Sequence, residues 1–265
     1  MQLYRKIDTA VYKYVEMKKK LFFLCLILWL LFSCRDKRPK YYYLSLNNYI
    51  TSVKIKGGII DSLENGDWSF YDSKDKLLSK GVFENGMRNG EWLYSIDNIK
   101  PKLTWQIYSN DSLFFKINYL SDWKIVPDNE NIFHASFQKT DSLKGKYLLV
   151  DKITNDTNKI KPAELSDLYL DMIKEHFEIK TINRFILTNN NRKVFLNIIE
   201  HIRYQKSFMI YQASFDINDN TYDIIYSTDD LSDLSGIIYF NIIESCFVRN
   251  IRVINPLYPY VFSKH

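Results

Sequence analysis

Glycine, proline and cysteine are scarce in this chain. It has 8 glycines, 6 prolines and 3 cysteines in 265 residues, against 20 tyrosines and 17 phenylalanines. This scarcity excludes collagen-like and Pro/Gly-rich low-complexity proteins, while the many aromatic side chains favour β-strands. With 46% hydrophobic and 25% charged residues, the composition is that of a globular protein.

Net charge is nearly absent after residue 33. Residues 1–33 carry six basic and two acidic side chains, so the other 30 basic and 29 acidic side chains contribute only +1 to the net charge of +5. A nucleic-acid-binding protein needs a broad basic surface that neutralises phosphates. We therefore expect no nucleic-acid partner.

Apolar runs long enough to cross a bilayer are also absent. The longest run, residues 21–32, has twelve apolar residues, whereas a membrane-spanning helix needs about 20. Three lysines at 18–20 precede the run, and Ser33-Cys34 follows it. A basic segment, a short apolar segment and a small residue at the cleavage site are typical of a secretory signal peptide.

The end of this segment, Leu31-Phe32-Ser33-Cys34, resembles the lipobox of bacterial lipoproteins. That family usually has a smaller residue where Phe32 stands. The resemblance implies that Cys34 is acylated, with palmitate among the acyl chains, and that two or three chains anchor the protein stably to a membrane. The alternative is a buried apolar helix that ends in cysteine.

The lipobox also divides the N-terminal part of the chain. We expect residues 1–33 to be the signal peptide, with residues 1–16 upstream of the true start at Met17. Residues 34–56 are then the lipidated cysteine and its tether. No aspartate follows Cys34 directly, which favours an outer-membrane or periplasmic-side location in the cell envelope if the host has two membranes.

The three cysteines predict no intramolecular disulfide. Cys25 is lost with the signal peptide and Cys34 takes the lipid, so Cys246 alone remains. Cys246 lies in an apolar run, which predicts a small buried side chain and not a nucleophile.

An internal repeat with a shift of 24 residues follows the tether. Residues 64–70 (Glu-Asn-Gly-Asp-Trp-Ser-Phe) align with residues 88–94 (Arg-Asn-Gly-Glu-Trp-Leu-Tyr), and Gly57 aligns with Gly81. Asn-Gly dipeptides recur in this stretch, and they tolerate the positive φ of β-hairpin turns. We therefore expect hairpins that bury their apolar face by stacking on one another.

These residues resemble the MORN-type repeat in its bacterial variant, over residues 57–108. Residues 66–71 and 83–92 carry the match. The resemblance implies an extended hairpin sheet that contacts protein or membrane and has no catalytic residues. The candidate binding residues are the repeat aromatics Trp68, Tyr71, Trp92 and Tyr94. Core packing is the alternative explanation for the two tryptophans.

Residues 110–250 have a different pattern, in which strands surround two helices. The segment Lys161-Pro162-Ala163-Glu164 opens one helix, with proline in its first turn. A second helix follows Asp229-Asp230, with an apolar stripe that ends at Cys246 and Phe247. The expected strands, rich in aromatic and β-branched residues, are 113–119, 123–126, 133–139, 147–153, 182–188, 194–203, 208–215 and 221–227. Residues 251–265 form a C-terminal tail.

This order predicts an α+β fold: an N-terminal β-hairpin repeat sheet followed by an antiparallel sheet packed with two helices. Residues 115–123, 211–226 and 242–247 resemble the PsbP-like fold, with Leu120 where that family usually has proline. The resemblance implies a binding or assembly module without a shared catalytic set.

Chemistry-bearing motifs are absent from the sequence. The four histidines, His134, His176, His201 and His265, lie too far apart for helical metal spacing, and no nucleophile–base motif occurs. We therefore expect no catalytic residue, metal or cofactor. The favoured function is a non-catalytic binding or scaffold lipoprotein, held by membrane lipid at Cys34 and contacting an envelope protein. An immunity- or antitoxin-like lipoprotein and a cell-envelope hydrolase are the alternatives.

Overall fold

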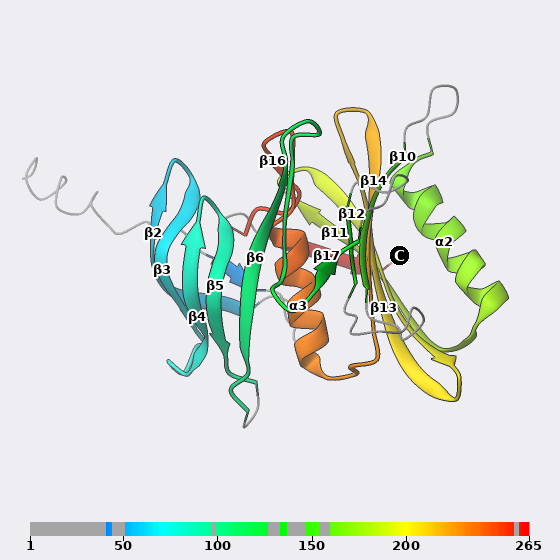
Figure 1. The fold of residues 1–265 in the computed structure, drawn as a ribbon, viewed down its shortest axis with the longest axis horizontal. Helices are drawn as coiled ribbons and strands as arrows, with labels where there is room; N and C mark the ends of the chain where they lie inside the picture. The colour runs from blue at the N-terminus through cyan, green and yellow to red at the C-terminus, as the bar shows by residue number, and fades with distance from the viewer. Residues whose placement is uncertain are drawn as a thin grey trace, which may run out of the picture. The chain divides into compact units, whose positions relative to one another are not determined.

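The structure, a computed structural model, describes residues 41–43, 51–96, 99–126, 133–136, 147–153, 160–256 and 260–264. The expected signal peptide and Cys34 lie outside these residues. Residues 40–265 form one unit, and its described part contains two antiparallel sheets and two helices (Figure 1). The chain is therefore α+β, as expected from the sequence.

The first sheet is a meander to which the chain later returns. Strands β1 to β7 pair in sequence order, and β15 and β16 continue the sheet beyond β7. Their bounds are β1 Tyr41–Tyr43, β2 Thr51–Ile60, β3 Leu63–Tyr71, β4 Leu77–Glu84, β5 Met87–Tyr94, β6 Lys102–Asn110, β7 Phe115–Leu120, β15 Phe247–Val248 and β16 Ile251–Arg252.

Two tryptophans of this sheet each lie against a glycine of the preceding strand. A Cβ at Gly57 would lie 2.2 Å from the ring of Trp68, and one at Gly81 would lie 2.3 Å from the ring of Trp92. Each indole N–H also donates to the carbonyl that follows its glycine, at 3.1 Å from Trp68 and 3.0 Å from Trp92. Only glycine leaves room for an indole at these two positions.

The second sheet has the order β17-β11-β12-β13-β14-β10-β9-β8. Long strands joined by two-residue turns form its centre, as alternating aromatic and β-branched residues favour. The bounds are β8 Lys124–Ile125, β9 Phe133–Ser136, β10 Tyr147–Ile153, β11 Glu178–Asn189, β12 Arg192–Arg203, β13 Lys206–Ile217, β14 Asn220–Thr228 and β17 Tyr260–Lys264.

The two helices contact this sheet in different ways. Helix α2 (Pro162–His176) packs Leu170 and Ile173 against β12 and β13. Helix α3 (Asp233–Glu244) contacts β7 of the first sheet as well as β13 and β14 of the second (Figure 1). Most of its side chains are buried, as expected for a helix that is apolar on most of its faces. Helix α3 therefore joins the two sheets.

Residues 115–120 pair differently from the sequence-based grouping, which placed them with the later strands. Strand β7 pairs with β6 in a continuous register from Trp105–Leu120 to Asn110–Phe115. A turn at residues 111–114 separates the two strands, and a connection this short favours pairing of neighbours.

The apolar stripe of the second helix is longer than the helix itself. Helix α3 ends at Glu244, and Phe247 and Val248 pair as a strand with β7. Cys246 is buried between the two elements, as expected. Periodicity alone cannot show this end, because a short apolar run is compatible with either a helix or a strand.

Candidate functional site

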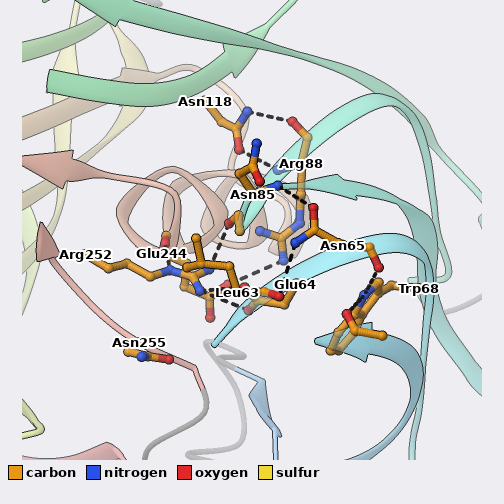
Figure 2. Close-up of polar contacts among 12 residues, drawn as sticks. Leu63, Glu64, Asn65, Trp68, Asn85, Arg88, Asn118, Glu244, Arg252 and Asn255 are labelled. Carbon is orange, nitrogen blue, oxygen red and sulfur yellow. Dashed lines mark hydrogen bonds and ion pairs between the residues drawn. The ribbon is translucent and has the colours of Figure 1, made fainter. Parts of the chain in front are cut away.

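Four charged side chains are buried together where β3, β5, α3 and β16 meet (Figure 2). Glu64, Arg88, Glu244 and Arg252 are exposed by 0%, 1%, 3% and 8%. Arg252 Nη1 donates to both carboxylate oxygens of Glu64, at 3.0 and 2.8 Å. Its Nε donates to the backbone oxygen of Glu244 at 2.6 Å. These bonds attach the C-terminal strand β16 to both β3 and α3.

Arg88 completes this ion cluster from the first sheet. Its Nη2 lies 3.4 Å from Glu244 Oε2, and its guanidinium carbon lies 4.9 Å from the ring centroid of Trp92. Asn118 accepts a hydrogen bond from the backbone N–H of Arg88 at 2.9 Å and donates to its carbonyl at 2.7 Å. The cluster is therefore fixed by backbone contacts as well as by charge.

The carboxylates of the cluster are engaged by guanidinium groups. Burial raises the pKa of Glu244, while the charges of Arg88 and Arg252 act in the opposite direction. A buried carboxylate paired in this way offers no exposed oxygen to a substrate, and removal of one partner leaves an uncompensated charge. The cluster therefore braces the fold at the point where β16 joins it.

A groove lies beside the hairpin that this cluster holds. We call it the junction groove because it is lined from both sheets: the β6–β7 turn, β15 and its turn, β10 and β14. It encloses about 500 Å³ and is lined by Ser112, Leu113, Phe114, Phe115, Lys152, Tyr222, Val248, Arg249 and Asn250. Phe115, Tyr222 and Val248 are buried, whereas Phe114 is 62% exposed.

Three residues of the junction groove, Phe114, Arg249 and Asn250, have left-handed backbone conformations, and asparagine is the only one of the three that tolerates them well. Phe114 has φ 50° and Arg249 has φ 49°, and the N–H of Arg249 donates to the carbonyl of Phe114 at 2.7 Å. A left-handed conformation costs a residue with a Cβ roughly 1–2 kcal/mol. Phe114 and Arg249 are exposed, so burial in the core does not offset this cost. Strain of this kind is characteristic of functional sites.

A neighbouring groove of about 390 Å³ shares Asn250 with the junction groove. It is lined by Lys116 and Glu84, among mainly apolar residues, so its two charges are of opposite sign. In the junction groove both charged residues, Lys152 and Arg249, are positive. The junction groove is therefore the better candidate for recognition of a ligand of one charge sign.

The residues singled out by the sequence lie mostly in the core of the first sheet. Trp68 is 1% exposed, and Trp92 and Tyr94 are 0% exposed. The hydroxyl of Tyr94 accepts hydrogen bonds from Trp105 Nε1 at 2.9 Å and Asn241 Nδ2 at 3.0 Å. Tyr71 is half-buried beside Lys56. Burial of the tryptophans is what the core-packing alternative predicts.

The histidines with described side chains do not form a common site. His201 is buried and contacts the rings of Phe177 and Phe208, and this burial lowers its pKa. His176 is exposed on α2. Among the residues that the structure describes, no group of His, Cys, Asp and Glu side chains could hold a metal ion. No helix in this described part is long and apolar enough to cross a membrane.

A second buried polar network lies between α2 and the second sheet. Asp223 accepts hydrogen bonds from Gln212 Nε2 at 2.9 Å and Ser214 Oγ at 2.8 Å. Asn197 connects Gln212 to Ser166 of α2. Burial raises the pKa of Asp223 to about 7, with Asp151 of β10 acting in the same direction and the two hydrogen bonds in the opposite one.

We expect the protein to lose stability as the pH rises from about 5 to about 8, because Asp223 must then ionise in its buried site. Asp223 ionises near 3.8 in the unfolded chain and near 7 in the folded one, so between these values the folded state binds more protons. The free energy of unfolding should drop by roughly 2–3 kcal/mol between about pH 5 and about pH 8. Asp223→Asn should remove that part of the slope, measured by urea unfolding at several pH values. An unchanged slope in the variant would show that other groups cause it.

Sequence reasoning missed the junction groove, because its residues come from four separate segments. The available signal was the pair Arg249-Asn250 between Phe247-Val248 and Ile251-Arg252, a position where a tight hairpin turn usually has Asn-Gly. Nothing local places Lys152 or Phe114 beside that turn.

Comparisons with known proteins identify no family. No protein family matches the chain, and no curated protein matches it. One solved structure that resembles it is a crystal structure of a protein of unknown function from Pseudomonas aeruginosa. The TM-score is 0.29 at 11% identity, and the match covers 56% of this chain and 88% of that chain. At this TM-score the likeness carries no argument about function.

Proposed function

We propose that this chain is an exported lipoprotein of the cell envelope that works as a non-catalytic binding or scaffold module. Acylated Cys34 anchors it to a membrane, and an envelope protein is its partner. The N-terminal layout of lysines, short apolar run and Ser33-Cys34 supports the anchor. The junction groove supports the binding role.

The binding role is carried by the exposure and the left-handed backbone conformation of Phe114 and Arg249. Both are exposed residues held in a left-handed conformation at the rim of a concave groove. The fold gains no core packing from either side chain, whereas a partner would gain an aromatic and a cationic contact, which are the residue types enriched at interfaces. The buried ion cluster attaches the supporting hairpin to β3 and α3.

The finer architecture belongs to the same proposal. Residues 57–108 form a repeat sheet of the MORN type, and residues 110–250 a PsbP-like domain, of which β7 and β15 pair with the repeat sheet. The equivalent contacts of Trp68 and Trp92 with their glycines support the first part, since they differ by the same shift of 24 residues as the sequence. In this arrangement the repeat tryptophans stabilise a platform that presents the junction groove.

The anchor is tested by Cys34→Ser in the producing cell. The native protein should be found in the membrane fraction, with its N-terminus at an acylated Cys34 in mass spectra. The variant should be released from the membrane or remain uncleaved. Cys246→Ser is the matched control and should change neither property. Unchanged processing and membrane association of Cys34→Ser would contradict the anchor.

A further inference from the structure

The charged residues of the junction groove have one sign. Lys152 and Arg249 line it together with apolar and polar residues, and no acidic side chain does. Within the described ranges neither cation forms an ion pair. Asp111, on the β6–β7 turn, accepts a hydrogen bond from Ser109 and does not line the groove. The groove therefore complements negative charge.

Phe114 and Arg249 are not the residue types that usually occupy left-handed turn positions. Asn85-Gly86, Asn190-Asn191 and Asn218-Asp219 place residues that tolerate the left-handed region at positive φ. Phe114 and Arg249 do not fit this pattern. Ser62, Tyr204 and Gln205 share positive φ with them, but none of these three lines the junction groove. What distinguishes Phe114 and Arg249 is that an exposed aromatic side chain and an exposed cation lie together in the lining of one groove.

The shape of the groove favours a protein segment over a membrane surface. Its floor is formed by the buried side chains of Phe115, Val248 and Tyr222. A flat lipid surface reaches protruding residues but not a recessed floor. A volume of about 500 Å³ lies within the usual range for ligand sites and holds a few side chains of an extended peptide.

We propose, on the basis of the binding function above, that the junction groove recognises an acidic segment of the partner protein. Carboxylates of that segment lie against Lys152 and Arg249, and an apolar side chain beside them packs on Phe114. The partner is thereby defined by chemistry: an extended, accessible segment that combines acidic and apolar residues.

The test uses the full chain purified in detergent and a short fluorescent peptide of alternating glutamate and leucine. Arg249→Asn should weaken binding about three- to five-fold, because one exposed charge contact is lost. The melting temperature should stay equal or rise, since asparagine tolerates the left-handed turn better than arginine. Phe114→Gly should behave in the same way. Lys80→Glu, at an exposed position on β4, should leave affinity and melting temperature unchanged.

Three results would overturn the proposal. The first is unchanged affinity in Arg249→Asn and Phe114→Gly. The second is equal binding of a peptide in which lysine replaces glutamate. The third is binding of phosphatidylglycerol vesicles, but not of the acidic peptide, through the same two residues. The peptide could fail to bind while the chain is still acylated and still cross-links to a protein. That result would reject the acidic segment as the ligand but not the proposed binding function. Loss of the anchor with peptide binding intact would instead reject the proposed location.

Discussion

Replacement of Trp92 by alanine is expected to lower the free energy of unfolding by about 3–5 kcal/mol, the range typical of a buried aromatic residue. Its ring is 0% exposed, lies against Gly81 and has the guanidinium of Arg88 at 4.9 Å. Its N–H donates to the carbonyl of Val82. Alanine would leave a cavity and an unpaired backbone acceptor. Urea unfolding followed by circular dichroism measures the loss.

Two further variants test whether the loss comes from the packing of the Trp92 ring or from a sensitivity of the sheet to any substitution. Gly81→Ala would place a Cβ 2.3 Å from the same ring, so it should also destabilise the protein, by about 1–3 kcal/mol or more through overpacking. Tyr204→Ala, at a residue that is 71% exposed, should change stability by less than about 1 kcal/mol. A Trp92→Ala loss as small as that of Tyr204→Ala would contradict the packing account.

Arg252→Met is expected to cost about 3–5 kcal/mol, because it leaves Glu64 buried without its guanidinium. Arg252 makes two bonds to the carboxylate of Glu64, which is 0% exposed, and one to the carbonyl of Gly86 at 3.1 Å. Methionine fills similar space without charge. The loss in the free energy of unfolding therefore reflects the unpaired carboxylate. It is measured from the shift in the midpoint of urea unfolding.

Two further variants serve as the control and the rescue for Arg252→Met. Lys54→Met breaks an exposed ion pair with Asp75 at 2.7 Å and should cost less than about 1 kcal/mol. Glu64→Gln combined with Arg252→Met removes the unpaired charge and should recover part of the loss. If Arg252→Met cost no more than Lys54→Met, the ion cluster would not brace the hairpin.

Local signals were sufficient for several elements. Proline at 162, with Glu164 accepting from the backbone N–H of Lys161 at 3.2 Å, begins α2 as expected for a capped helix. The strand expected at 147–153 has the same bounds as β10. Asn85-Gly86 forms the expected tight turn between β4 and β5. Each of these features depends on residues close together in the chain.

The remaining features depend on contacts that no local pattern encodes. Glu64 and Arg252 are separated by 188 residues, and both read as ordinary surface charges in the sequence. The pairing of β15 with β7 depends on where α3 ends, which apolar periodicity does not fix. The junction groove depends on the Glu64–Arg252 contact and on the β15–β7 pairing, since the chain must return to the first sheet before Arg249 can approach Phe114.

The most direct test of the account is a cross-link from position 114 in the membranes of the producing cell. With a photo-reactive phenylalanine analogue in place of Phe114, we predict one protein product. It should weaken in Arg249→Asn and compete with the glutamate–leucine peptide, and it should be absent when the analogue replaces exposed Tyr204. Identical products from both positions, or products at position 114 that neither Arg249→Asn nor the peptide reduces, would contradict a binding role for the junction groove.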